Sequence, residues 1–318
     1  MTDYKQTIIT ELDVLRRTSM SETAGTFKSR VYATAIKTLN GLGPIRSVAD
    51  LPVEKGNGLG EKVRQKIAEI IATGHLGAAD RGREKAPDSL DVFRNIYGVG
   101  PKKAADLVTA GYRSIADLRA VTNPKLLNKN QQIGLRYYEP LLERIPREEM
   151  CRHEALLMAH KASLTGVIVG SYRRGRPDSG DIDMLVSTSA DAPAALKQFV
   201  QSLQAVGYIK EILALGDSKC LAIAALPSGT PRRLDLLVTP PAEMPFAILY
   251  FTGSDRFNVR MRQRALELGL TLNEHGMARK TGEQVTGIRT ERDIFSYLKM
   301  AWKEPAERLG AEAVVIVE

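Results

Sequence analysis

The amino-acid sequence predicts a multidomain α+β protein, in which a helical N-terminal part precedes a unit built on a mixed or antiparallel sheet. Its 318 residues are enough for two or three compact units. In the first 80 or so residues, apolar side chains recur at helical spacing, as at Ile8, Leu12 and Leu15. After about residue 160 the pattern changes to short apolar runs, which are typical of buried strands.

The individual elements follow from local patterns. A second helical stretch runs from about Leu90 to Ala162, after a polar segment, Arg81–Pro87, that has the composition of a linker. Later strands are predicted at Val167–Val169, Met184–Val186 and Leu234–Val238. Later helices are predicted at Pro193–Val206 and Arg256–Leu268. The last 75 residues mix helix with short strands and turns.

Composition narrows the class of protein. The chain carries 45 Lys and Arg against 37 Asp and Glu, a net charge of +8, which suits a polyanionic partner. Two distant cysteines, Cys151 and Cys220, argue against a disulfide framework and against a structural zinc site. No signal peptide or membrane-spanning stretch is recognisable, so we expect an intracellular protein that does not bind membranes.

An internal repeat predicts a DNA-backbone contact. Gly58-Leu59-Gly60 and Gly98-Val99-Gly100 each lie between two helical segments, in the helix-hairpin-helix pattern. Glycines let backbone amides approach a phosphate closely at a helix N-terminus. A plain helical hairpin explains one copy equally well. Two copies, each followed by lysines (Lys62 and Lys66; Lys102 and Lys103), favour binding to DNA.

Three aspartates form the candidate catalytic centre. Asp181 and Asp183 alternate with apolar residues in a predicted strand, so both carboxylates face the same way. Asp235 lies in a second strand that could pair beside the first. Three carboxylates suit two divalent cations roughly 4 Å apart, which stabilise both the attacking and the leaving oxygen of a phosphoryl displacement.

The preceding G-S-Y-R-R-G run, residues 170–175, adds a site for phosphate. Its glycines permit a tight turn, and Ser171 and Arg174 can hold triphosphate oxygens. A Gly-Ser pair followed by D-x-D marks nucleotidyltransferases in general, so these residues leave the substrate open.

Further motifs narrow the family. The sequence closely resembles the family X DNA polymerases, near the beta and lambda enzymes, through R-I-P-R-E-E-M (144–150), G-S-Y-R-R-G-R-P-D-S-G-D-I-D (170–183) and Y-F-T-G-S-D (250–255). Similarity extends from about Phe27 to Arg308. It implies a helical lyase and 5′-phosphate-binding domain (1–81), a DNA-binding fingers subdomain (82–146), a nucleotidyltransferase-type palm (147–241) and a nascent-base-pair-binding thumb (242–318).

The resemblance also assigns roles to single residues. It implies that Asp181 and Asp183 bind both metals and that Asp235 activates the primer 3′-hydroxyl. The implied nucleotide contacts are Arg144, Ser171, Arg174, Ser179 and Gly180 for the triphosphate, Tyr250 and Phe251 near the sugar, and Asp255 and Asn258 for the base, with Gly253 as a further nucleotide-binding residue. Arg262 is implied to contact the template strand.

A second activity is implied for Lys66, which resembles the Schiff-base nucleophile that removes a 5′-deoxyribose phosphate. A lysine must be partly deprotonated to attack an aldehyde. Lys62 lies one turn earlier on the same helix face, and its charge would lower the pKa of Lys66. The alternative is that Lys66 only binds phosphate.

Departures from the family pattern refine the expectation. Leu237 replaces an arginine that competes for the third aspartate in the beta enzyme, so that switch is expected to be absent or different. Val259 replaces a long basic residue that stacks on the template. Only Pro227–Pro231 lies where the template-independent branch has a long loop, which favours a templated enzyme.

The resulting hypothesis is a gap-filling repair polymerase. We expect two Mg²⁺ ions, with Mn²⁺ as a substitute, and a monovalent cation (Na⁺ or K⁺) at the hairpin turns. The expected partners are gapped or nicked double-stranded DNA and a dNTP, for a monomer that could work with repair proteins such as a ligase. The expected location is the nucleus in a eukaryote, otherwise the cytoplasm or a virion. A tailing nucleotidyltransferase and a non-catalytic repair scaffold are the alternatives.

Overall fold

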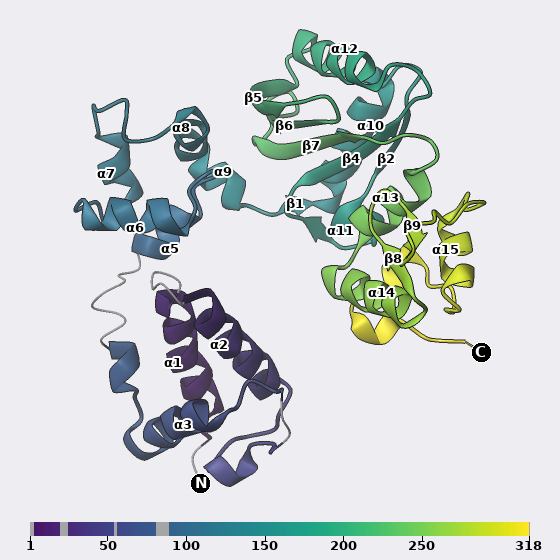
Figure 1. The fold of residues 1–318 in the computed structure, drawn as a ribbon. Coiled ribbons are helices and arrows are strands. Elements are labelled where there is room, and N and C mark those ends of the chain that lie inside the picture. The colour runs from purple at the N-terminus through teal and green to yellow at the C-terminus, as the bar shows by residue number, and fades with distance from the viewer. Residues whose placement is uncertain (1–2, 20–24, 54–55, 81–88, 318) are drawn as a thin grey trace. The chain divides into compact units, whose positions relative to one another are not determined.

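A computed structural model describes residues 3–19, 25–53, 56–80 and 89–317, and the chain divides into two units, Met1–Arg136 and Tyr137–Glu318 (Figure 1). The linker expected at 81–87 lies outside the described residues. Among the described residues, no helix is both long and apolar enough to cross a membrane.

Every element described in the first unit is a helix, as predicted for this part of the chain. The helices are α1 (Lys5–Thr18), α2 (Gly25–Asn40), η2 (Val48–Asp50), α3 (Glu61–Thr73), α5 (Ser89–Arg94), α6 (Pro101–Thr109), α7 (Ile115–Arg119) and α8 (Lys129–Arg136). Side chains at helical spacing pack α1, α2 and α3 together, including Ile8, Leu39 and Ile67, each completely buried.

The turn before α3 is held closely against α2. Gly58 has a φ of +77°, and a Cβ there would lie 2.4 Å from the Ala35 backbone nitrogen. Arg64 of α3 fastens the same turn, because its Nε donates to the Leu59 carbonyl at 2.9 Å and its Nη2 donates to the Pro52 carbonyl. The Gly-x-Gly turn is therefore positioned by packing and by an internal guanidinium group.

The second unit is built on a five-stranded mixed sheet, where the sequence predicted a mixed or antiparallel sheet. Its order is β2 (Thr165–Ile168), β4 (Ile182–Ser187), β7 (Arg232–Val238), β6 (Lys219–Ala224) and β5 (Ile209–Leu215). The β4–β7 pair is parallel and the other pairs are antiparallel. The strands expected at 167–169, 184–186 and 234–238 correspond to β2, β4 and β7.

The two faces of this sheet have different cover (Figure 1). Alternate residues such as Ile182, Met184 and Leu236 are buried in one core with α10 (Arg147–His160) and α12 (Ala192–Ala205). On the opposite face, Leu185 and Leu237 pack with α13 (Met244–Thr252). Side chains that alternate with the first core, including Asp183 and Asp235, belong to the α13 face.

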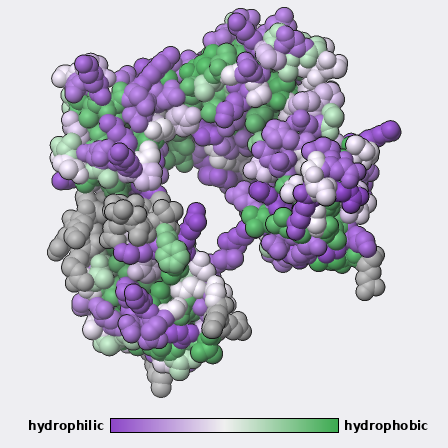
Figure 2. Space-filling view, in the orientation of Figure 1, coloured by the Kyte–Doolittle hydropathy of each residue, from purple (hydrophilic) through white to green (hydrophobic). Residues whose placement is uncertain are grey.

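The remaining elements of this unit surround the sheet or follow it. They are α9 (Tyr138–Leu142), β1 (Ile145–Pro146), α11 (Gly170–Arg173), β3 (Asp178–Ser179), α14 (Asp255–Glu267), β8 (Leu270–Leu272), β9 (Met277–Arg279), α15 (Glu291–Tyr297), η3 (Pro305–Glu307) and η4 (Ala311–Ala313). The helices predicted at 193–206 and 256–268 correspond to α12 and α14. On the face shown in Figure 2, hydrophilic residues predominate and hydrophobic residues lie in scattered patches.

A buried charge network joins α11 to the C-terminal elements. Arg308 is completely buried, and its Nη1 donates to Glu291 at 2.6 Å. Arg173 of α11 donates to the other oxygen of the same carboxylate at 2.5 Å. Removing one partner of such a buried pair would leave an uncompensated charge, so the three side chains fix α11 relative to α15.

Candidate active site

The three predicted carboxylates lie at one end of the parallel strand pair. Asp183 of β4 stands directly opposite Asp235 of β7 in the register of the sheet, and Asp181 comes one residue before β4. Arg233, two residues before Asp235, bridges the group: its Nη2 is 3.1 Å from Asp181 Oδ2 and 2.9 Å from Asp235 Oδ2. The sheet thus brings together the aspartates that the sequence proposed from two distant motifs.

Negative charge dominates this cluster. Burial, followed by the charges of Asp181 and Asp235, raises the pKa of Asp183 to about 7. Burial also raises the pKa of Asp235, although Arg233 opposes the shift. Protonation of Asp183 near neutral pH would compete with cation binding, so binding a cation there releases protons.

This donor set fits divalent cations, because carboxylate oxygens with raised pKa values favour a hard cation between them. As they stand in the part of the chain that is described, no three His, Cys, Asp or Glu side chains are arranged to hold an ion. The guanidinium of Arg233 instead contacts two of the three carboxylates. Arg233 would therefore have to yield to an incoming cation.

A glycine turn brings the phosphate-binding segment against the carboxylates. Gly170 begins α11 with a φ of +63°, and a Cβ at this position would lie 2.7 Å from Asp183 Oδ2. The next residue, Ser171, donates a hydrogen bond of 2.9 Å from its Oγ to that of Ser179. Ser179 is almost fully buried, so its side chain positions Ser171 and does not line the cavity.

Both arginines predicted for the triphosphate contact protein groups. Arg144 precedes β1, and its Nη2 lies 2.6 Å from Asp178 Oδ1. Arg174 follows α11 and donates from Nη1 to the Thr252 carbonyl. These bonds hold the guanidinium groups next to the glycine turn. Without them, both side chains would be free to sample many rotamers.

An open cavity of about 550 Å³ collects most of the predicted nucleotide site. The predicted residues that line it are Arg144, Ser171, Arg174, Gly180, Asp181, Asp183, Tyr250, Phe251, Gly253, Asp255, Asn258 and Arg262. Asp235 is not on its wall, but it is adjacent through its pairing with Asp183. Gly170 and the exposed Val259 complete the lining.

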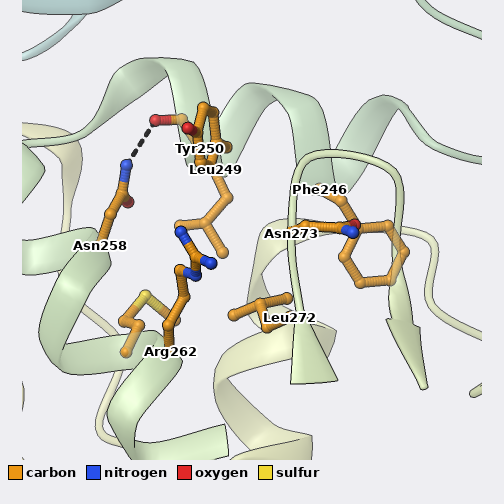
Figure 3. Close-up of a pocket in the computed structure, with 8 residues that line it drawn as sticks. Phe246, Leu249, Tyr250, Asn258, Arg262, Leu272 and Asn273 are labelled. Atoms are coloured by element: carbon orange, nitrogen blue, oxygen red, sulfur yellow. Dashed lines mark hydrogen bonds between the residues drawn. The ribbon is translucent and has the colours of Figure 1, made fainter.

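A small neighbouring pocket, of about 10 Å³, lies between α13, α14 and β8 (Figure 3). Asn258 Nδ2 donates to the Tyr250 carbonyl at 2.6 Å, the bond drawn in Figure 3. Arg262 extends from α14 toward Leu249 and Tyr250. Tyr250, Asn258 and Arg262 line both this pocket and the larger cavity, so a ligand in the cavity would contact the α13–α14 junction.

The predicted residues of the first unit lie on its two Gly-x-Gly turns and the helices that follow them. Gly60 and Gly100 are exposed and cap the N-termini of α3 and α6. Lys62 and Lys102 are exposed in the first turns of these helices, and Lys66 is half-buried on α3.

Sequence reasoning missed three contributors to the site: Arg233, Asp178 and Thr252. Arg233 could have been found, because it lies two residues before Asp235 on a strand and so on the same face. Asp178 and Thr252 act through contacts with Arg144 and Arg174. No sequence pattern predicts those contacts. Leu237 presents an apolar side chain that packs against α13.

Three models of known protein families match successive segments of the chain. Residues 91–142 match the family model of the DNA polymerase lambda fingers domain, 144–241 the DNA polymerase beta palm, and 247–309 the DNA polymerase beta thumb. The three catalytic aspartate candidates fall within the palm match, and the α13–α14 junction falls within the thumb match.

Similarity to whole proteins extends over most of the chain. It is 31% identical to DNA polymerase lambda of Rattus norvegicus over 96% of this chain, and 30% identical to that of Arabidopsis thaliana over 79%. A DNA polymerase type-X family protein, pol4, of Schizosaccharomyces pombe is 27% identical over 95%. The alignments cover 56%, 52% and 64% of those relatives, so the chain spans between half and two thirds of their length.

Proposed function

The chain belongs to the family X DNA polymerases, near the beta and lambda enzymes, and from this premise we propose that it is a template-directed DNA polymerase that fills short gaps in DNA repair. The observation that carries the proposal is the pairing of Asp183 with Asp235 beside a cavity lined by Arg144 and Arg174. This arrangement combines a carboxylate centre with cations for a triphosphate.

In the proposed reaction, the primer 3′-oxygen attacks the α-phosphorus of the dNTP. The bond from that phosphorus to the bridging oxygen of the β-phosphate breaks, and pyrophosphate leaves. Asp235 orients the 3′-hydroxyl and takes its proton. Arg144, Arg174 and Ser171 hold the triphosphate oxygens, so the protein contributes mainly positioning and electrostatic stabilisation.

Asp181, Asp183 and Asp235 would hold two Mg²⁺ ions, or Mn²⁺ in their place. Such ions supply positive charge to the oxygens on which negative charge develops. The fit of this donor set rests on the raised pKa values of Asp183 and Asp235.

The α13–α14 junction is proposed to select the nucleotide. The crowded backbone at Tyr250 and Phe251 would exclude a ribose 2′-hydroxyl, with Gly253 giving the chain its turn (φ +68°). Asp255 and Asn258 would contact the incoming base, while Arg262 would contact the template strand. All of these residues line the cavity, which supports their grouping around one ligand.

Incorporation on a one-nucleotide gap tests the proposal. We expect the dNTP complementary to the templating base to be added efficiently, with little use of the matching rNTP. Efficient addition of rNTPs to an unpaired RNA end would favour the tailing nucleotidyltransferase instead. Tight binding of gapped DNA without any incorporation would favour the non-catalytic scaffold.

For the first unit we propose binding to the DNA backbone and a lyase activity. The Gly-x-Gly turns before α3 and α6, whose second glycines Gly60 and Gly100 are exposed, would act as helix-hairpin-helix motifs, with Lys62 and Lys102 beside the phosphates. Carbonyl groups of these turns would bind a Na⁺ or K⁺ ion. The proposed domains are residues 1–81 (lyase), 82–146 (fingers), 147–241 (palm) and 242–318 (thumb).

Borohydride trapping tests Lys66 as the lyase nucleophile. On a one-nucleotide gap bearing a 5′-deoxyribose phosphate, we expect a covalent adduct with the wild-type protein. The adduct should be lost in Lys66→Ala, whereas in Lys62→Ala it should still form, although more slowly, because only the amine that attacks the aldehyde forms the Schiff base. If the wild type gives no adduct, this unit only grips the 5′-phosphate, and end joining becomes the more natural role.

Gapped or nicked DNA and a dNTP are the proposed substrates of a monomeric enzyme, with a ligase as a natural successor because it seals the nick left after filling. Such work takes place inside the cell, where the DNA is: in the nucleus of a eukaryote, and otherwise in the cytoplasm or a virion.

A further inference from the structure

The contact between Arg144 and Asp178 stands at the rim of the proposed nucleotide site. Arg144 Nε and Nη2 lie 3.0 and 2.6 Å from Asp178 Oδ1, and Nη2 also donates to the Asp178 carbonyl at 3.4 Å. Arg144 lines the 550 Å³ cavity, and its Nη1 lies 3.0 Å from where a Cβ of Gly180 would be. The guanidinium is thus held beside the carboxylate centre by an acidic side chain.

Local pairing fixes this contact. In the two-stranded β1–β3 sheet, Ile145 pairs with Ser179 and Pro146 with Asp178. Arg144 comes directly before β1, and Asp178 is the first residue of β3. The pairing of these two strands therefore brings the two side chains close together. The sheet therefore places a carboxylate beside an arginine that the proposed reaction needs for phosphate oxygens.

The ion pair is weak enough to exchange. The side chains of Arg144 and Asp178 are 58% and 46% exposed, and exposed pairs contribute little to stability because water screens them. A nucleoside triphosphate carries several negative charges and offers the guanidinium a bidentate phosphate contact, which is stronger than a contact to one carboxylate oxygen. The same guanidinium donors cannot serve both acceptors fully.

We infer that Asp178 competes with the triphosphate for Arg144. It holds Arg144 when no nucleotide is bound, and it weakens nucleotide binding because Arg144 must leave it to bind phosphate. The inference rests on the proposed polymerase function. It adds a residue that sets nucleotide affinity by acting through Arg144. The released carboxylate also stays near the triphosphate, where its charge opposes binding in the same direction.

Nucleotide affinity of Asp178→Asn tests this inference. The Kd of the complementary dNTP is measured with Mg²⁺ and a one-nucleotide gap whose primer ends in a dideoxynucleotide, so that no incorporation follows. We expect the Kd to fall about 2- to 5-fold in Asp178→Asn, the range of an exposed ion pair. Inhibition by pyrophosphate should strengthen in the same variant.

Two further variants separate competition from general charge. Asp217→Asn makes the same charge change at an exposed position in the β5–β6 turn, and its Kd should equal that of the wild type. In an Arg144→Ala background, Asp178→Asn should have much less effect, because the competitor has lost its target. An equal gain in both backgrounds would overturn action through Arg144.

The outcomes distinguish this inference from the function on which it rests. A wild-type protein that binds no dNTP would remove the proposed polymerase. A wild-type protein that binds dNTP, with a Kd that stays constant or rises in Asp178→Asn, would overturn the inference alone. A rise would mean that Asp178 preorganises Arg144 for the triphosphate.

Discussion

Asp235→Ala is expected to lower the rate of single-nucleotide incorporation by about 10³-fold or more. Asp235 is the proposed acceptor for the 3′-hydroxyl proton, and it stands opposite Asp183 in the sheet. Its loss removes both a metal ligand and the group that orients the attacking oxygen. Single-turnover incorporation on a one-nucleotide gap, with dNTP and Mg²⁺ both saturating, measures the effect.

DNA affinity should remain nearly intact in this variant, because DNA phosphates are attracted by cations and Asp235 is an anion. Binding of the same gapped duplex is therefore the internal control for folding. Asp217→Ala, which removes an exposed carboxylate from the β5–β6 turn, should incorporate at the wild-type rate. Normal extension by Asp235→Ala would contradict the assignment of the catalytic centre.

Gly58→Ala is expected to destabilise the packing of α2 against α3 by about 2–5 kcal/mol. The new methyl group would lie 2.4 Å from the Ala35 nitrogen and 2.9 Å from both the Thr34 carbonyl carbon and the Val31 oxygen, all of them backbone atoms of α2. The φ of +77° adds the strain of a left-handed conformation. These backbone atoms cannot move without shifting α2.

Amide hydrogen exchange in α2 and α3 measures this effect locally within the intact chain. Two neighbouring glycines serve as matched controls. Gly56→Ala shares the positive φ (+88°) but meets open space, so it should cost only the conformational strain. Gly60→Ala has an ordinary φ of −64° and open space, so it should leave exchange nearly unchanged.

The same three glycine variants separate the packing role of the turn before α3 from its proposed contact with a DNA phosphate. Gly60→Ala should instead weaken binding of a 5′-phosphorylated gap, because its methyl group would occupy the exposed side of the turn. If Gly58→Ala exchanges like the wild type, the close approach of this turn to α2 is not a stability determinant.

The amino-acid sequence alone predicted a mixed or antiparallel sheet and the three aspartates of the proposed carboxylate centre. Alternation in β4 placed Asp183 on the face opposite Ile182 and Met184, and the apolar run of β7 identified a second strand carrying Asp235. These are local signals with a period of two residues, which remain readable without knowledge of the partners. The motifs around Gly170 and Tyr250 indicated the family through their resemblance to its members, not through periodicity.

The tertiary structure decided which charges meet. Arg173 and Glu291 are 118 residues apart, and Arg144 and Asp178 are 34 apart, yet each pair forms an ion pair. Gly58 was predicted for phosphate approach, whereas the structure also gives it a packing role against α2. Contacts between side chains distant in sequence depend on how strands pair and helices pack, and that geometry leaves no periodic trace in the chain.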